Sequence, residues 1–348
     1  MKIELCHQAE DTWNQFVEHS QSASIFHLHE WQTIIRRAYG HPAFYLMAVD
    51  RGRVEGVLPL VLIKSRLFGR SLVSMPFADY AGVCGGDQGV FTLLLNEAVK
   101  LGRSLQADYL QLRQSPFACA PKTGVSEVEL STEKVTMLLD LSRDPDLIWK
   151  RLPSERRNRI KRARQLGLTA RWGGNEAIDE FYQVFAENMR DLGSPVHSKL
   201  FFQSVVDTLG ERVKVLLIEY RGGIIGAGIC LFFRDTMLIP WVSSLRHYFK
   251  QHPNMLLYWS AIEYGCEKGY AVLDLGRSSK DSGTYEFKRQ WGARPVLLPW
   301  YGIPFNGGPV PSFSSRGLRD RLLISCWKRL PLTVTNYVGP WLRGSIPA

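Results

Sequence analysis

The stretch VKVLLIEYRGGIIGAGICLFF, residues 213–233, decides the fold. Two apolar runs, 213–220 and 224–233, flank the turn RGG at 221–223, which is the pattern of a β-hairpin. Further along, the sequence predicts a third strand, a helix with apolar residues at helical spacing, and a final strand, at 237–243, 254–268 and 270–276. A hairpin followed by strand, helix and strand is typical of a mixed α/β domain.

The same order of elements occurs 170 residues earlier, counted from Arg51 to Arg221. The predicted elements there are two strands around the turn RGR, a third strand, a helix and a last strand, at 44–49, 54–63, 71–76, 90–105 and 108–113. The turns also align, since RGRVEG at 51–56 corresponds to RGGIIG at 221–226. We interpret this as an internal duplication. The alternative is chance recurrence, because this order is common in mixed α/β proteins.

Length and composition predict two folded domains. The chain has 348 residues, which is too long for one ordinary core. Of these residues, 45% are hydrophobic and 11% aromatic, as in folded proteins. Helices are expected between the two similar halves, at 146–167, 175–192 and 199–209. We therefore expect a first domain at 1–145, a helical region leading into the second domain at 146–212, the core of the second domain at 213–304 and a tail at 305–348.

Location is predicted from the apolar runs and the cysteines. The start of the chain lacks a signal-peptide pattern, and the longest apolar run, 57–63, is far short of the roughly 20 residues that span a bilayer. The six cysteines form no CxxC pair, which favours free thiols in a reducing compartment. A cytoplasmic location is expected. A basic amphipathic stretch at 318–330 either rests peripherally on the inner membrane surface or packs on its own domain.

Positive charge gathers in one segment of a chain whose net charge is +10. Residues 150–171 contain nine Lys and Arg and a single acid, Glu155. A helix is expected there with these basic side chains exposed: Arg156, Arg157, Arg159, Lys161 and Arg164. This face predicts an anionic partner, such as a nucleotide diphosphate, tRNA or acidic lipid, and no DNA. The alternative is an ordinary solvated face, and a further alternative is RNA binding alone, although no aromatic platform is interleaved with the charges.

Familiar catalytic motifs are missing from the sequence. There is no GxxxxGK[ST], HExxH or GxSxG, and HLH at 27–29 puts two histidines on one side of a strand without a third ligand. The densest polar cluster is DLGRSSKDSGTYEFKRQW, residues 274–291, which begins where an apolar strand ends. It is the predicted site. An exposed loop is the alternative, but it would not need the aromatic residues Tyr285, Phe287 and Trp291.

Several motifs carry a family resemblance over residues 10–302. They are FHLHEW (26–31), GVLPLV (56–61), SMPFADYAG (74–82), ENMRDLGSPVH (187–197), NMLLYW (254–259) and DLGRSSKDSGTYEFKRQWGA (274–293). With these motifs the sequence resembles the FemAB-like family of the GNAT superfamily, in particular the FemAB-related proteins associated with exosortase (PEP-CTERM) systems. The resemblance implies an α/β (α+β) fold that is a tandem duplication of a GNAT-like mixed-sheet domain.

The resemblance also implies a reaction, the transfer of an acyl or aminoacyl group to an amine of a cell-envelope or exopolysaccharide precursor. Better studied relatives add amino acids from aminoacyl-tRNA to peptidoglycan precursors. Their Phe-Lys pair beside the acyl group matches Phe287 and Lys288, so Lys288 is expected to stabilise the tetrahedral oxyanion. We expect it in an extended segment, pointing into a polar cleft while Tyr285 and Phe287 share the other face.

The resulting site prediction has two parts. The catalytic candidates are Lys288, Asp281 and Tyr285. The candidates for substrate binding are Arg36, Arg37, Tyr80, Arg190, Asn254, Tyr258, Trp259, Asp274, Arg277, Ser278, Phe287, Gln290 and Trp291. Among them, Arg36, Arg37 and Arg190 correspond to positions that hold the diphosphate of a nucleotide-linked sugar acceptor in relatives.

Two departures from the family pattern leave the donor open. There is no coiled-coil insertion of the kind that some members carry, and the turn RHYFKQHPN at 246–254 lacks the glycines of the GNAT pyrophosphate loop. No cofactor is therefore assigned, and the donor is either aminoacyl-tRNA or acyl-CoA. Two other functions remain open, a noncatalytic GNAT-fold scaffold of an exopolysaccharide or exosortase system and an acyl-CoA-dependent N-acetyltransferase.

Overall fold

The computed structural model describes residues 1–6, 9–118, 128–308, 310–311 and 318–347. The chain forms two compact units, each made of discontinuous segments. The first contains Met1–Val135, Val296–Phe313 and Gly344–Ala348, and the second contains Thr136–Pro295 and Ser314–Arg343. The division therefore falls near 135 and 295, where the sequence predicted 145 and 304. The helical region 146–212 lies entirely within the second unit.

The first unit is built on a seven-stranded sheet with the order β1-β2-β3-β4-β5-β14-β6. Leucines of β3, such as Leu58 and Leu60, pack against Leu94 and Ala98 of α3 to form its core. The elements are β1 (Lys2–Leu5), α1 (Glu10–His19), η1 (Ile25–His27), α2 (Glu30–Tyr39), β2 (Ala43–Asp50), β3 (Arg53–Ser65), β4 (Gly69–Val73), α3 (Gln88–Ser104), β5 (Tyr109–Arg113), β6 (Glu129–Ser131) and β14 (Trp300–Pro304).

The second unit contains the other seven-stranded sheet, in the order β13-β7-β12-β11-β10-β9-β8. Its elements are β7 (Lys134–Asp140), α4 (Pro145–Arg151), α5 (Ser154–Gln165), β8 (Thr169–Gly173), η2 (Asn175–Ala177), α6 (Ile178–Leu192), α7 (Lys199–Leu209), η3 (Gly210–Arg212), β9 (Val213–Tyr220), β10 (Gly223–Phe233), β11 (Thr236–Ser244), η4 (Arg246–Gln251), α8 (Pro253–Glu267), β12 (Val272–Ser279), α9 (Gly283–Arg289), β13 (Arg294–Leu297), α10 (Leu318–Lys328) and α11 (Leu332–Ser345).

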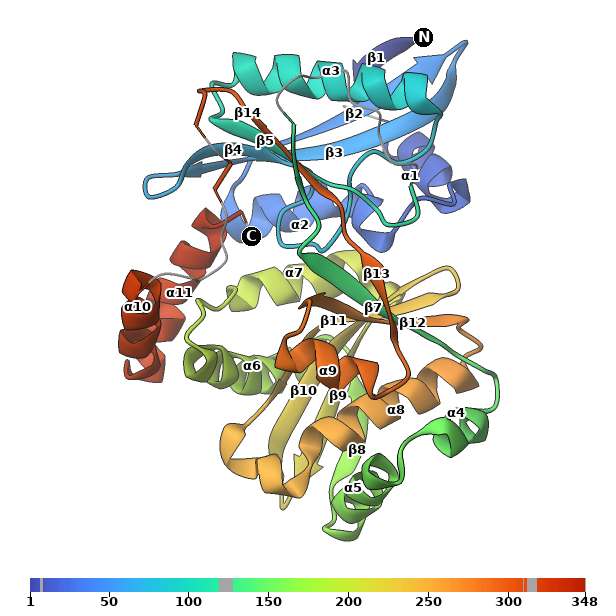
Figure 1. Cartoon of the computed structure of the whole chain (residues 1–348), viewed down its shortest axis with the longest axis vertical. Helices are drawn as coiled ribbons and strands as arrows, with labels where there is room; N and C mark the ends of the chain where they lie inside the picture. Colours follow the sequence, from blue (N-terminus) through green and yellow to red (C-terminus); the bar gives the residue numbers. More distant parts are fainter. Residues whose placement is uncertain (7–8, 119–127, 309, 312–317, 348) are drawn as a thin grey trace. The chain divides into compact units, whose positions relative to one another are not determined.

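Strand β10 shows how the second sheet is covered. Its residues are buried without interruption from Ile225 to Phe233, which requires apolar cover on both faces of the sheet. Figure 1 shows α6 and α8 on opposite sides of these strands. The helices were predicted from the spacing of their apolar residues, and α6 and α8 begin within three residues of the predicted positions.

The two sheets repeat one topology, which confirms the predicted fold class. In each, three strands pair antiparallel in sequence and the fourth, after a helix, pairs parallel to the third, so β5 is equivalent to β12. The repeat is longer than the sequence suggested. Each unit also has an edge strand before its hairpin, β1 or β8, which pairs antiparallel with the next strand.

The aligned turns of the two hairpins share their backbone conformation. Arg51 and Gly52 have φ values of 47° and 80°, and Arg221 and Gly222 have 51° and 78°. Positive φ at both central residues is the signature of a type I′ turn. A bulge follows at the same offset, because the pairing skips Glu55 in β3 and Ile225 in β10. Identical turns and bulges at equivalent positions support the duplication.

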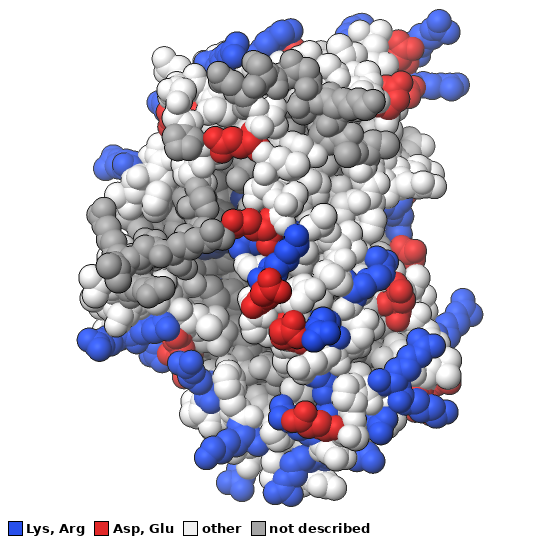
Figure 2. Space-filling model, viewed as in Figure 1, with Lys and Arg blue, Asp and Glu red and all other residues white. Residues whose placement is uncertain are grey.

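The predicted helix at 146–167 is two helices, α4 and α5, separated at Leu152 and Pro153. Proline lacks the amide hydrogen that a continuous helix needs. Arg159, Lys161 and Arg164 are exposed as predicted, and Figure 2 shows Lys and Arg gathered over the region where Figure 1 places α4 and α5. The prediction was wrong for Arg156, which is buried.

Two further elements differ from the sequence prediction. Residues 25–27 form the short helix η1 rather than a strand, so the HLH motif does not lie on a sheet. At the other end of the chain, a second helix, α11, follows the predicted basic stretch. Within the residues that the model describes, no helix is long and apolar enough to cross a membrane.

Candidate functional site

The predicted site lies at the end of β12 and on α9, entirely within the second unit. The segment around Lys288 is helical, so the prediction of an extended segment was wrong. Ser282 caps α9, and its hydroxyl accepts a hydrogen bond from the amide of Tyr285. In a helix, residues three apart lie on one face, so Tyr285 and Lys288 share a face, rather than Tyr285 and Phe287.

Lys288 is held at the end of β12. Its side chain is 7% exposed, and the ammonium donates hydrogen bonds to the carbonyls of Gly276, at 2.9 Å, and Arg277, at 3.0 Å. Successive residues of a regular strand alternate in direction. Gly276 has a φ of 76°, which breaks this alternation and lets both carbonyls reach one ammonium. The sequence therefore places a fixed positive charge at this strand end.

Asp274 stabilises the bend at Gly276. Its carboxylate is fully buried and accepts hydrogen bonds from the hydroxyl of Thr136 and, at 2.8 Å, from the amide of Gly276. Thr136 lies on β7, the neighbour of β12 in the sheet. The sequence did not reveal this contact, because it joins residues 138 positions apart. Asp274, predicted to bind substrate, has a role in the local structure.

An aromatic cluster packs behind Lys288. The ring of Tyr258 lies 5.1 Å from that of Phe287 and 5.9 Å from that of Trp291. Burial raises the pKa of the Tyr258 hydroxyl well above its usual range, so this group stays neutral at physiological pH. Three predicted site residues from α8 and from the segment 287–291 are thus brought together as a hydrophobic support for α9.

Arg156 joins α5 to this cluster. Its guanidinium lies 4.8 Å from the ring centre of Phe287 and 5.0 Å from that of Trp291. It also donates to the backbone carbonyl of Phe287 at 3.2 Å and to the side-chain oxygen of Gln290. Burial, and secondly Arg159, lower its pKa to about 10, so it remains charged at neutral pH. The buried face of α5 could have revealed it, because Arg156 precedes Ile160 by four residues.

The remaining predicted residues of this unit lie around the same elements. Asn254, at the start of α8, accepts a hydrogen bond from Ser244 at 2.7 Å, and Trp259 packs on Trp149 at 4.8 Å. Arg277 is half-buried, while Asp281 and Gln290 are exposed. Several buried polar atoms of the described residues have no hydrogen-bond partner, and those near this site include the Ser278 hydroxyl, Arg156 Nε and the indole nitrogens of Trp259 and Trp291. Such atoms are rare unless a ligand or water meets them.

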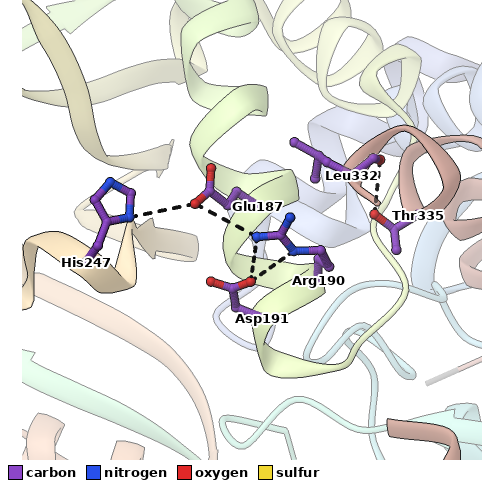
Figure 3. A network of polar contacts seen from close by, with 6 residues as sticks. All are labelled: Glu187, Arg190, Asp191, His247, Leu332 and Thr335. Atoms are coloured by element: carbon purple, nitrogen blue, oxygen red, sulfur yellow. Dashed lines mark hydrogen bonds and ion pairs between the residues drawn. The ribbon is translucent and has the colours of Figure 1, made fainter. Parts of the chain in front are cut away.

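Arg190 lies on α6, in a separate polar network (Figure 3). Its guanidinium contacts Asp191 at 2.8 Å and Glu187 at 4.0 Å, and His247 approaches the same Glu187 carboxylate at 3.9 Å. Two carboxylates therefore offset the charge of the predicted diphosphate-binding arginine. The other distant candidates belong to the first unit, where Arg36 and Arg37 are exposed in the last turn of α2 and Tyr80 is buried against Phe26.

A cavity of about 620 Å³ in the second unit lies apart from the predicted site residues. It is lined by parts of α5, β8 and α8, including Trp172 and Tyr264, whose ring centres lie 4.3 Å apart. None of the predicted catalytic or substrate-binding residues lines it. This cavity is therefore separate from the predicted site.

Solved structures share the fold of this chain. The crystal structure of FemX aligns with a TM-score of 0.68 and 13% sequence identity, over 87% of this chain and 98% of that one. A tandem GNAT protein from the clavulanic acid biosynthesis pathway aligns with a TM-score of 0.56 and 13% identity, over 89% and 99%. L-PGS from Bacillus licheniformis aligns with a TM-score of 0.55 and 12% identity, over 92% and 97%.

Sequence comparison is more restricted. Curated proteins give no match to this chain. Residues 154–289 match the family model described as an acetyltransferase (GNAT) domain, and this segment runs from α5 through β12 to the end of α9, including Lys288. The chain thus has a mixed α/β fold with two mixed sheets, the arrangement of tandem GNAT structures, and its second unit carries the GNAT-family match.

Proposed function

We propose that the second unit transfers an acyl or aminoacyl group to an amine, with Lys288 as a catalytic residue. The observation that carries this proposal is the buried ammonium of Lys288 fixed at the end of β12, inside the segment that matches the GNAT family. Burial of a charged side chain is costly, so its retention needs a structural or a functional reason, and the family match supports the functional one.

The chemistry needs a positive charge at one stage. The acceptor nitrogen attacks the acyl carbon, a carbon–nitrogen bond forms, and the carbonyl oxygen becomes an oxyanion. Collapse of this intermediate breaks the bond from the acyl carbon to the donor's oxygen or sulfur. That atom takes up the proton that the nitrogen loses, which leaves an amide and the free alcohol or thiol. An ammonium beside the oxyanion lowers the barrier by about 3 kcal/mol. Arg156 acts as a positioning residue in this proposal, because it holds the backbone of Phe287 next to Lys288.

Other residues complete the proposed site. Ser278 lies beside Arg277 on β12 with its hydroxyl buried and unmatched among the described residues, which makes it a hydrogen-bonding group for substrate. Tyr285 shares the face of α9 with Lys288, and Asp281 lies in the turn before α9. We propose Tyr285 and Asp281 as the remaining catalytic contributors.

The proposed acceptor is an amine on a cell-envelope or exopolysaccharide precursor, as the sequence resemblance implies. The donor is aminoacyl-tRNA or acyl-CoA, both of which are anionic. The exposed basic side chains of α5 support an anionic donor, because Lys161 and Arg162 face solvent, whereas Arg159 and Arg164 are paired with Glu155 and Glu263. Cytoplasmic localisation is part of the same proposal, since both donors occur there.

A transfer assay tests this function. Purified full-length protein is mixed with a small-molecule cell extract and either acetyl-CoA or aminoacyl-tRNA, each labelled in the acyl group. Mild alkali hydrolyses esters and thioesters but leaves amides, so the proposal predicts alkali-stable label from one donor. If all label stays alkali-labile with both donors and the full extract, the chain is the noncatalytic scaffold that the sequence left open.

A further inference from the structure

The two C-terminal helices expose large apolar side chains to an unusual extent. Leu322 and Leu323 of α10 are 68% and 62% exposed, and Tyr337 and Trp341 of α11 are 87% and 58% exposed. Single exposed hydrophobic residues are normal on a protein surface, but a group of them marks a contact surface. Tyr337 and Trp341 are four residues apart and share one face of α11, and we name these two residues the C-terminal apolar surface.

The outward direction of this surface follows from helical spacing. Val334, Tyr337 and Trp341 are separated by three and four residues and form one stripe on α11. The opposite face contains Thr335 and Gly339, which are buried. A side chain at Gly339 would meet Val196 at 3.0 Å and Trp327 at 3.6 Å, so this face already packs on the second unit. The exposed stripe is therefore additional to the packed face.

The helix pair is also anchored by a polar contact. Arg343 of α11 donates a hydrogen bond of 3.1 Å to the buried ring of His197, which follows α6. On α10, Ile324 lies against Gly193 at the end of α6. Figure 1 shows α10 and α11 beside α6, and Figure 3 shows the first turn of α11 near Arg190. The apolar surface thus belongs to a docked part of the fold.

Charge distinguishes the partners that could cover it. From residue 321 to the end, the sequence contains Arg321, Lys328, Arg329 and Arg343 and no Asp or Glu. Lys328 and Arg329 are exposed at the junction of the two helices. A second copy of this chain would bring like charges together, which is unfavourable. An anionic surface would be attracted.

We propose that the C-terminal apolar surface docks on an anionic phospholipid bilayer. Tyrosine and tryptophan favour the membrane–water interface because one part of each ring is apolar and the other is polar. Basic residues beside them attract anionic headgroups. With 14 residues, α11 is too short to span a bilayer, so this helix lies in the interface plane. This inference goes beyond the proposed function and does not depend on it.

Vesicle sedimentation tests the proposal. Full-length protein is mixed with vesicles of phosphatidylcholine alone or with added phosphatidylglycerol. We expect binding to the mixed vesicles that weakens as salt rises. The double variant Tyr337→Ser/Trp341→Ser should lower the partition coefficient by about tenfold or more, because two large apolar side chains no longer enter the interface. Lys328→Gln/Arg329→Gln should lower binding to the mixed vesicles only.

The control is Leu67→Ser/Phe68→Ser, which removes two exposed apolar side chains from the turn between β3 and β4. It should bind vesicles as wild type does. The proposal would be overturned if Leu67→Ser/Phe68→Ser lost as much vesicle binding as Tyr337→Ser/Trp341→Ser. It would also be overturned if wild type bound vesicles with and without phosphatidylglycerol equally. A dimer of the wild type that Tyr337→Ser/Trp341→Ser converts to monomer without any vesicle binding would overturn it as well, because the surface would then join two copies. Melting temperatures show whether each variant is folded.

Discussion

The candidate site contains two cationic side chains, Lys288 and Arg156, which make different contacts. Lys288 is bonded to backbone carbonyls, whereas the guanidinium of Arg156 lies over aromatic rings and reaches the backbone of α9. A compact ammonium suits the point charge of an oxyanion, and a planar guanidinium suits stacking and forked hydrogen bonds. We therefore propose separable roles for the two residues, transfer for Lys288 and positioning for Arg156.

The role of Arg156 predicts a loss of stability on a conservative change. Arg156→Lys keeps the charge but loses the planar fork and the stacking on Phe287, so the free energy of unfolding should fall by roughly 2 kcal/mol. The matched control is Arg159→Lys on the exposed face of the same helix, where the change should be under about 0.5 kcal/mol. Urea unfolding measures both. Equal stability of the two variants would contradict the packing described for Arg156.

His197 predicts a dependence of stability on pH. Burial, with Arg343 beside it, lowers the pKa of this histidine well below its ordinary value. Above pH 6.5 it is neutral in both folded and unfolded chains, and its contribution is complete. Below pH 6.5 only the unfolded chain takes up the proton, so the free energy of unfolding falls by up to about 1.4 kcal/mol per pH unit.

The measurement compares wild type with His197→Gln between pH 5 and 7. Glutamine accepts a hydrogen bond from Arg343 but does not titrate, so the variant should have a shallower slope by up to one proton. Burial also lowers the pKa of His29, His41 and His252. These histidines contribute equally to the pH dependence of the unfolding free energy in wild type and variant. Identical slopes would show that His197 titrates alike when folded and unfolded.

At the scale of the element, the hairpin turns provide a test of backbone conformation. Gly222 has a φ of 78° and open space around it, so Gly222→Ala should cost about 1 kcal/mol through strain alone. The adjacent Gly223 has no positive φ, and a side chain there would meet only the Tyr220 carbonyl at 3.8 Å. Gly223→Ala should be nearly neutral. Thermal unfolding of the two variants would reject the type I′ assignment if they were equally stable.

Sequence patterns predicted most elements because their causes are local. The hairpins, α6, α7 and α8 follow from apolar spacing and from glycine in turns, and they lie near the predicted positions. The sheet partners outside the repeat were not predictable in this way. The strand β14 pairs with β5, which lies almost 190 residues earlier, since Trp300 faces Arg113. Such pairing depends on tertiary packing and not on local sequence.

The site was predictable in part for the same reason. Clustering of polar and aromatic residues pointed to Lys288, Phe287 and Trp291, and the family resemblance added Tyr258. The structure brings the three aromatic rings together, while the site itself stays a prediction. Arg156 was assigned to the solvated face because it lies in a run of charges, although its spacing from Ile160 places it on the buried face. The helix α11 was missed because Gly339 and Pro340 interrupt its helical pattern.

At the scale of the whole molecule, the net charge of +10 predicts salt-dependent binding of an anionic donor. If α5 contacts the phosphates of aminoacyl-tRNA, the logarithm of affinity should fall linearly with the logarithm of salt concentration. Lys161→Gln/Arg162→Gln removes two exposed charges and should reduce that slope by about 2. Filter binding over a salt series measures the slope, and an affinity that ignores salt would leave α5 as a solvated face.

The central claim, that the second unit performs N-acyl transfer with the Lys288 ammonium, is tested most directly by one rate. Formation of alkali-stable product is followed under single-turnover conditions for wild type, Lys288→Met and Lys288→Arg, and each rate is divided by the folded fraction from melting curves. We predict a fall of roughly 10² or more for Lys288→Met and partial recovery for Lys288→Arg. An unchanged rate per folded molecule in Lys288→Met would contradict the claim and make Lys288 a structural residue.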